Sequence, residues 1–132
     1  MERIERTALR NLIHNEEYSR KVLPFIKEDY FSDRLERLLF KEIYRFITKF
    51  NALPTKEALS IEINDSKDIT EDEYKKITDI IATLNPEKIN LEWLVETTEK
   101  FCKDRAIHNA ILSGIQIIDG KDKKHTPEYL PD

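Results

Sequence analysis

Glu92 and Glu96 have the spacing of a pair of catalytic acids. On a helix they share one face, where two carboxylates can act as general acid and general base. The pairs Glu96–Lys100 and Glu99–Lys103 place an acid four residues before a base, which stabilises an exposed helix by about 0.2–0.5 kcal/mol per pair. We therefore interpret these carboxylates as part of a solvated helix face, and we predict no catalytic residue.

The other residue types that carry chemistry form no local site. The three histidines, His14, His108 and His125, lack the close pairing of a zinc-binding helix. Only two glycines, Gly114 and Gly120, are present, and the sequence contains no GxxxxGK[ST] loop that could cradle a phosphate. We predict no metal site, no nucleotide-binding site and no cofactor.

The single cysteine, Cys102, falls within a long helical segment. We predict a buried, inert thiol, since a free cysteine usually behaves as a small hydrophobic side chain. One cysteine gives no disulfide framework, and the sequence shows neither a signal peptide nor an apolar run of membrane-spanning length. We therefore expect the protein in a reducing cytoplasm.

The only basic cluster lies near the end of the chain, at Lys121, Lys123, Lys124 and His125. We interpret it as part of a solubilising linker, and contact with DNA is the alternative. The net charge is −4, so the chain has no overall positive field that would attract nucleic acid. We expect weak direct binding of single-stranded DNA, or none.

Composition and periodicity predict an all-α fold. The 132 residues are 39% apolar and 36% charged, with two glycines and five prolines, which favours helices over a turn-rich β fold. We expect a compact bundle of about five short helices over residues 1–88, a long projecting helix over 89–119 and a tail or linker over 120–132. The predicted helix caps are Asn15, the pair Ser32 and Asp33, Thr55, Thr70 (in a capping box with Glu73), Asn90 and, at the end of the long helix, Gly120.

The long helix is the most informative element. At 1.5 Å per residue it runs about 40 Å, which exceeds what a domain this small can bury along its side. Its apolar seam is therefore expected to pair with a second copy or with a partner helix. Trp93 and Tyr44 are interpreted as core residues, with a role as partner anchors as the alternative. The predicted oligomer or partner interface comprises Leu94, Phe101, Arg105, His108, Ile111, Ile115 and Ile118.

Several local strings, in their order and spacing, resemble the N-terminal domain of DnaB-type hexameric replicative helicases, and above all those of T-even-like tailed phages. The long late helix with its Arg105-Ala106 pair adds to the likeness. Together the strings span roughly residues 9–119. They are LIHNEEYSRKVLPFI (12–26), YF (30–31), LFKEIYRFI (39–47), LPTKEAL (53–59), ITEDEYKKI (69–77) and WLVETTEKFCKDRAIHNAI (93–111).

The resemblance implies a non-catalytic collar domain. In this family the long helix leads into a helical hairpin, hairpins of two subunits pack together, and three such dimers form a collar. The collar guides the DNA strand and docks primase within the primosome. Residues 90–119 match the first arm of that hairpin, and the second arm is expected near or after Asp132. The ATPase domain, which binds ATP and Mg²⁺ in an ATP-dependent 5′-to-3′ DNA helicase, is then expected outside this chain.

Two other functions fit the same sequence. The helicase-binding module of a primase has a similar helical bundle with a hairpin. A free-standing phage adaptor or regulatory protein would present the same exposed helix without any further domain. A small hydrolase is a more distant alternative.

Overall fold

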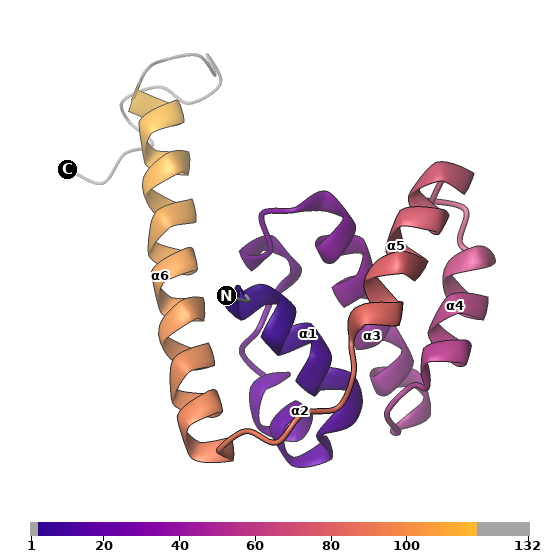
Figure 1. The fold of residues 1–132 in the computed structure, drawn as a ribbon. Helices are drawn as coiled ribbons and strands as arrows, with labels where there is room; N and C mark the ends of the chain where they lie inside the picture. The colour runs from indigo at the N-terminus through magenta and orange to yellow at the C-terminus, as the bar shows by residue number, and fades with distance from the viewer. Residues whose placement is uncertain (1–2, 119–132) are drawn as a thin grey trace.

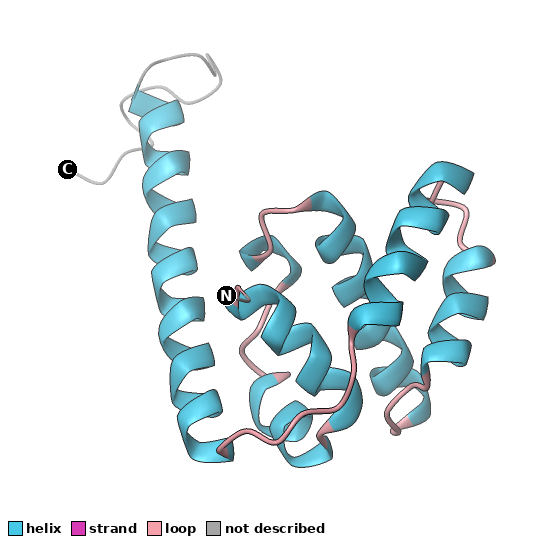
Figure 2. Cartoon of the chain, in the orientation of Figure 1, coloured by secondary structure: helices cyan, strands magenta, loops and turns pink. Residues whose placement is uncertain are grey.

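The computed structural model describes residues 3–118, and it is all-helical over that range, with no strand (Figures 1 and 2). The predicted all-α fold is confirmed. The predicted tail over 120–132 and the predicted stop at Gly120 lie outside the described residues. The elements are α1 (Ile4–His14), α2 (Glu16–Val22), the 3-10 turn η1 (Glu28–Tyr30), α3 (Arg34–Phe50), α4 (Lys56–Asn64), α5 (Glu71–Thr83) and α6 (Leu91–Ile118).

Local capping sets the helix boundaries, as the sequence predicted. Asn51 ends α3 in the left-handed conformation (φ 52°), which asparagine adopts more readily than most residues. Thr70 and Glu73 form the predicted capping box at the start of α5. Five predicted N-cap side chains accept a hydrogen bond from a backbone N–H of the first turn: Asn15, Asp33, Thr55, Thr70 and Asn90. Of the predicted pair Ser32 and Asp33, Asp33 is the cap.

The bundle is organised around α3, which contacts α1, α4, α5 and η1. The pair α4 and α5 lies on the side of the bundle away from α6 (Figure 1). The long helix α6 contacts α1, α2 and η1. The apolar core is continuous between these helices, and its largest fully buried hydrophobic side chains are Leu9, Leu12, Tyr18, Phe31, Leu39, Ile43, Leu59, Ile63, Ile77, Leu84 and Leu94.

Two aromatic residues predicted for the core lie at the surface instead. Trp93 is 53% exposed and Tyr44 is 44% exposed. Trp93 directly precedes the buried Leu94, and consecutive residues of a helix point about 100° apart. Tyr44 lies one turn beyond the buried Phe40 and contacts its ring at 6.1 Å between centroids. The core interpretation was therefore wrong for both residues.

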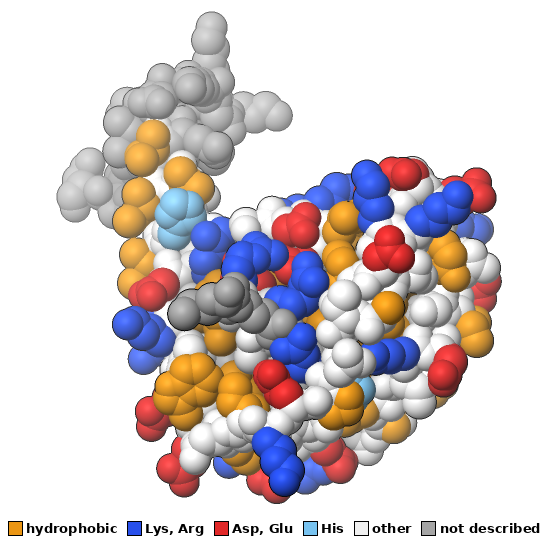
Figure 3. Space-filling view, viewed as in Figure 1, with side chains coloured by type: hydrophobic (Ala, Val, Ile, Leu, Met, Phe, Trp, Pro, Cys, Tyr) orange, Lys and Arg blue, Asp and Glu red, His pale blue; other side chains and the backbone are white. Residues whose placement is uncertain are grey.

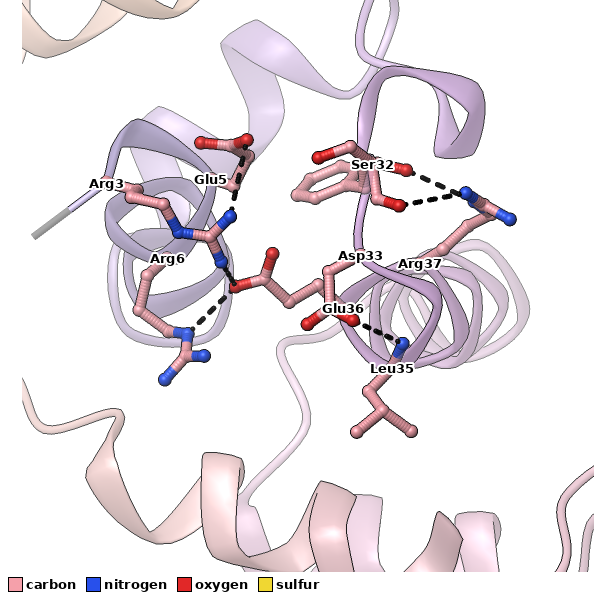
Figure 4. A network of polar contacts seen from close by, with 9 residues as sticks. Arg3, Glu5, Arg6, Ser32, Asp33, Leu35, Glu36 and Arg37 are labelled. Carbon is pink, nitrogen blue, oxygen red and sulfur yellow. Dashed lines mark hydrogen bonds and ion pairs between the residues drawn. The ribbon is translucent and has the colours of Figure 1, made fainter.

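A buried carboxylate joins α1 to α3 (Figure 4). Glu36 is fully buried, and its Oε2 accepts hydrogen bonds from Arg3 Nη2 at 2.6 Å and from Arg6 Nε at 3.1 Å. Its Oε1 has no hydrogen-bond partner among the described residues. Burying a carboxylate is costly unless it is paired, so the two guanidinium groups hold the start of α1 against α3.

We predict that Glu36→Ala lowers the free energy of unfolding by about 2 kcal/mol, measured by urea denaturation. The value lies below that of a fully buried ion pair because half of the Arg3 side chain stays in solvent. The matched control is Glu16→Ala, which removes the exposed Glu16–Arg20 pair and should change stability by less than about 0.5 kcal/mol. Equal losses in the two variants would contradict a structural role for the Glu36 network.

Candidate interaction surface on the long helix

The first half of α6 is anchored to the bundle by a buried hydrogen bond and by apolar packing. Thr98 and Tyr18 are both buried, and their hydroxyl oxygens are 2.8 Å apart. The Thr98 hydroxyl donates to the Leu94 carbonyl at 2.7 Å, so the Tyr18 hydroxyl is the donor to Thr98. Leu94 and Cys102 lie in the core on the same side of α6. These contacts fix the direction in which α6 leaves the bundle.

Anchoring continues to about Asn109. Phe101 packs edge-on against the buried Phe31, with 6.4 Å between the ring centroids. Asn109 Nδ2 donates to the Asp29 carbonyl of η1 at 3.2 Å. Beyond this point α6 projects past the bundle (Figure 1). The helix therefore has an anchored part and a free part.

Large exposed apolar side chains run from the end of the anchored part onto the free part. Ile107, Ile111 and Ile115 follow one another at four-residue intervals, so they form a stripe along α6, here called the outer stripe. They are 60%, 56% and 49% exposed, and the adjacent Leu112 is 46% exposed. Figure 3 shows hydrophobic side chains gathered on this part of the molecule. Contiguous exposed apolar surface of this kind usually marks an interaction site.

The predicted interface divides between the two parts of α6. Leu94 is 0% exposed within its own bundle, so placing it at an interface was wrong. Phe101 and Arg105 are half-buried on the anchored part, and Arg105 Nε is buried without a hydrogen-bond partner among the described residues. The side chain of Ile118 lies outside the described residues. The remaining predicted residues are exposed: His108 at the end of the anchored part, and Ile111 and Ile115 on the free part.

The prediction omitted two residues of this surface. Ile107 was predicted to lie in the apolar seam of the long helix but was not assigned to the interface, although it lies one turn before Ile111. Leu112 follows Leu94 and Phe101 on the anchored face of the helix, but it lies beyond the end of the bundle. Its exposure depends on how far the bundle covers α6, which local spacing does not indicate.

Burial sets the chemistry of Cys102, as the sequence predicted. The thiol is 5% exposed, and desolvation, reinforced by the nearby Glu99 charge, raises its pKa to about 12. Residues 3–118 contain no group of three or more histidine, cysteine or acidic side chains that could hold a metal ion. Among the described helices, none is long and apolar enough to cross a membrane.

A shallow groove lies on another part of the bundle. It has a volume of about 290 Å³ and is lined by Leu23, Pro24, Phe40 and Tyr44, with Lys27, Glu28 and Lys41 among its charged residues. The exposed ring of Tyr44 therefore borders a concave surface, which is the setting in which aromatic side chains commonly anchor a protein partner.

Comparison with known proteins identifies the relationship. No protein-family model matches the chain. The chain is 31% identical over 109 residues to a DnaB-like replicative helicase of Enterobacteria phage T4, and the match covers 83% of this chain. The chain is a domain related to the DnaB-type replicative helicases. The match covers 23% of the phage protein's length, so this helicase-related domain corresponds to under a quarter of that relative.

Truncating an apolar side chain should lower the stability of the chain in the anchored part of α6 and leave it nearly unchanged in the free part. We predict that Leu94→Ala destabilises the helicase-related domain by about 3 kcal/mol, because it opens a cavity in the core. Ile111→Ala should change the free energy of unfolding by less than about 0.5 kcal/mol, because its side chain is largely solvated in the single chain. Urea denaturation of dilute samples measures both values. A loss at Ile111 equal to that at Leu94 would contradict the division of α6.

The raised pKa of Cys102 predicts slow reaction with Ellman's reagent, because only the thiolate reacts. Because the folded chain favours the neutral thiol, ionisation of Cys102 favours the unfolded chain. The free energy of unfolding is therefore unaffected by this group below the ordinary thiol pKa of 9.0, and it falls as the pH rises from there towards about 12. Near neutral pH the folded chain should react at least about a hundredfold more slowly than the urea-unfolded chain. Ser113→Cys in a Cys102→Ala background is the exposed control, and it should react rapidly. Equally rapid reaction of Cys102 would contradict its burial.

Proposed function

We propose that this chain is the N-terminal collar domain of a replicative DNA helicase and that it joins helicase subunits through the outer stripe of α6. The observation that carries the proposal is an exposed apolar stripe on a helix whose other end is fixed in the core. The relationship to a DnaB-like replicative helicase supports the helicase part of the proposal. In this account α6 is the first arm of a helical hairpin, and paired hairpins assemble as a trimer of dimers within a hexamer.

Simple energetics indicate how strong the contact should be. Completing the burial of a half-exposed isoleucine or leucine gains on the order of 1 kcal/mol. The outer stripe and the adjacent Leu112 place four such residues on each of two chains, which gives about 8 kcal/mol, comparable to the 4–15 kcal/mol cost of bringing two molecules together. The outer stripe together with Leu112 should therefore support weak self-association. In a ring, contacts between linked subunits reinforce one another, so a weak contact suffices there.

Docking of primase is the second part of the proposal. It follows from the resemblance to the collar domain, and the exposed aromatic residues Trp93 and Tyr44 are suitable anchors for such a partner. ATP hydrolysis and DNA unwinding are assigned to parts of the helicase outside this chain. Single-stranded DNA passes through the assembled ring in this account and makes little direct contact with the domain.

We predict that Ile111→Asp combined with Ile115→Asp abolishes self-association, because two carboxylates would have to be desolvated in an apolar contact. Sedimentation equilibrium across a wide concentration range measures the association constant. The matched control places two aspartates elsewhere, at the exposed positions Thr48 and Ile61. It should self-associate like the unmodified chain. An unchanged association constant in the α6 double variant, or a monomeric unmodified chain at every concentration, would contradict the proposal.

A further inference from the structure

A second hollow lies beside the groove that Tyr44 borders, between α2 and the second half of α3. It has a volume of about 370 Å³, which falls within the range of small ligand sites. Its larger apolar lining side chains are Leu23, Pro24, Tyr44, Ile47 and Leu53. Ser19 of α2 lines it as well, so it is here called the Ser19 hollow.

The Ser19 hydroxyl is buried without a hydrogen-bond partner among the described residues, and the residue is only 2% exposed. A serine or threonine within a helix often donates its hydroxyl to a carbonyl of the preceding turn. Thr78, Thr83 and Thr98 do so in this chain, at 2.7–2.8 Å. Ser19 makes no such bond. Because an unpaired buried hydroxyl is unfavourable, a ligand group that pairs with it gains affinity.

Pro24 leaves a second polar group without its usual partner. Proline has no N–H, so the Arg20 carbonyl, four residues earlier, has no helical donor. The carbonyls of Ser19 and Val22 both accept backbone hydrogen bonds. Arg20 also lines the hollow, and its side chain pairs with Glu16 at 2.8 Å, so the two lining charges neutralise each other. The hollow therefore suits an uncharged group with an apolar body and a hydrogen-bonding tip.

We propose that the Ser19 hollow binds a tyrosine side chain of a partner protein, with the phenol hydroxyl hydrogen-bonded to Ser19. A phenol combines an apolar ring with a hydroxyl that both donates and accepts, as the serine hydroxyl does, whereas an indole N–H only donates. The domain already contains a buried contact of this kind, between the hydroxyl oxygens of Tyr18 and Thr98 at 2.8 Å. The site is independent of self-association through the outer stripe, which lies on α6.

The experiment is a titration of the isotope-labelled full chain with N-acetyl-tyrosinamide, followed by the amide chemical shifts in NMR spectra. The matched probe is N-acetyl-phenylalaninamide, which lacks only the hydroxyl. We expect a dissociation constant on the order of millimolar for the tyrosine probe, because a single side chain supplies little contact area. The largest shifts should fall within residues 19–24 and 44–53. The phenylalanine probe should bind about threefold to tenfold more weakly.

Three variants divide this binding into its parts. Ser19→Ala should abolish the preference, so that both probes bind equally. Because the hydroxyl has no partner in the folded chain, this variant should match or exceed the unmodified chain in urea denaturation. Ser60→Ala is the matched control, since the half-buried Ser60 of α4 lines a different hollow, and it should keep the preference. Tyr44→Ala removes part of the apolar wall and should weaken both probes alike.

Several results would overturn the proposal. Amide shifts that stay unchanged around the Ser19 hollow, at probe concentrations about tenfold above the expected dissociation constant, would exclude the site. Equal binding of the two probes to the unmodified chain, or a preference that survives Ser19→Ala, would exclude the hydrogen bond. A large loss of stability in Ser19→Ala would show that the hydroxyl has a partner in the folded chain. None of these results bears on the outer stripe, and a monomeric chain that prefers the tyrosine probe would leave this proposal standing.

Discussion

The docking of the first half of α6 onto the bundle is the constraint on which the other features of this domain depend. The buried hydrogen bond between Tyr18 and Thr98 and the core position of Leu94 determine the direction of the helix. The helix has 28 residues, or about 42 Å at 1.5 Å per residue, and the bundle contacts it only to about Asn109. Anchoring one end of so long a helix leaves the other end exposed.

The bundle against which α6 packs is itself stabilised by the ion pairs of a buried carboxylate, Glu36. Glu36 lies within an apolar stripe of α3, three and four residues before the buried Leu39 and Phe40. Its charge is tolerated there because Arg3 and Arg6 reach it from α1. The same helix α1 also contacts α6. The Glu36 network thus stabilises the position of α1, which is part of the surface on which the long helix packs.

The locally determined features of this domain were predictable from sequence, whereas the features that depend on distant contacts were not. Asn15, Thr70 and Asn90 cap helices through residues only three positions away, so the starts of these three helices were predicted correctly. Glu36 is paired with residues 33 and 30 positions away, and no local pattern indicates such partners. The apolar residues of α6 were predicted as one seam. Their division into buried Leu94 and exposed Ile111 depends on where the bundle ends.

The central claim is that the free part of α6 is a contact surface between copies of the chain. Hydrogen–deuterium exchange at low and high protein concentration tests it most directly, because it locates any contact along the chain. We expect amides over about residues 104–115 to exchange more slowly at high concentration, with little change in α4 and α5. Exchange that is independent of concentration, or added protection at the Tyr44 groove with none on α6, would contradict it.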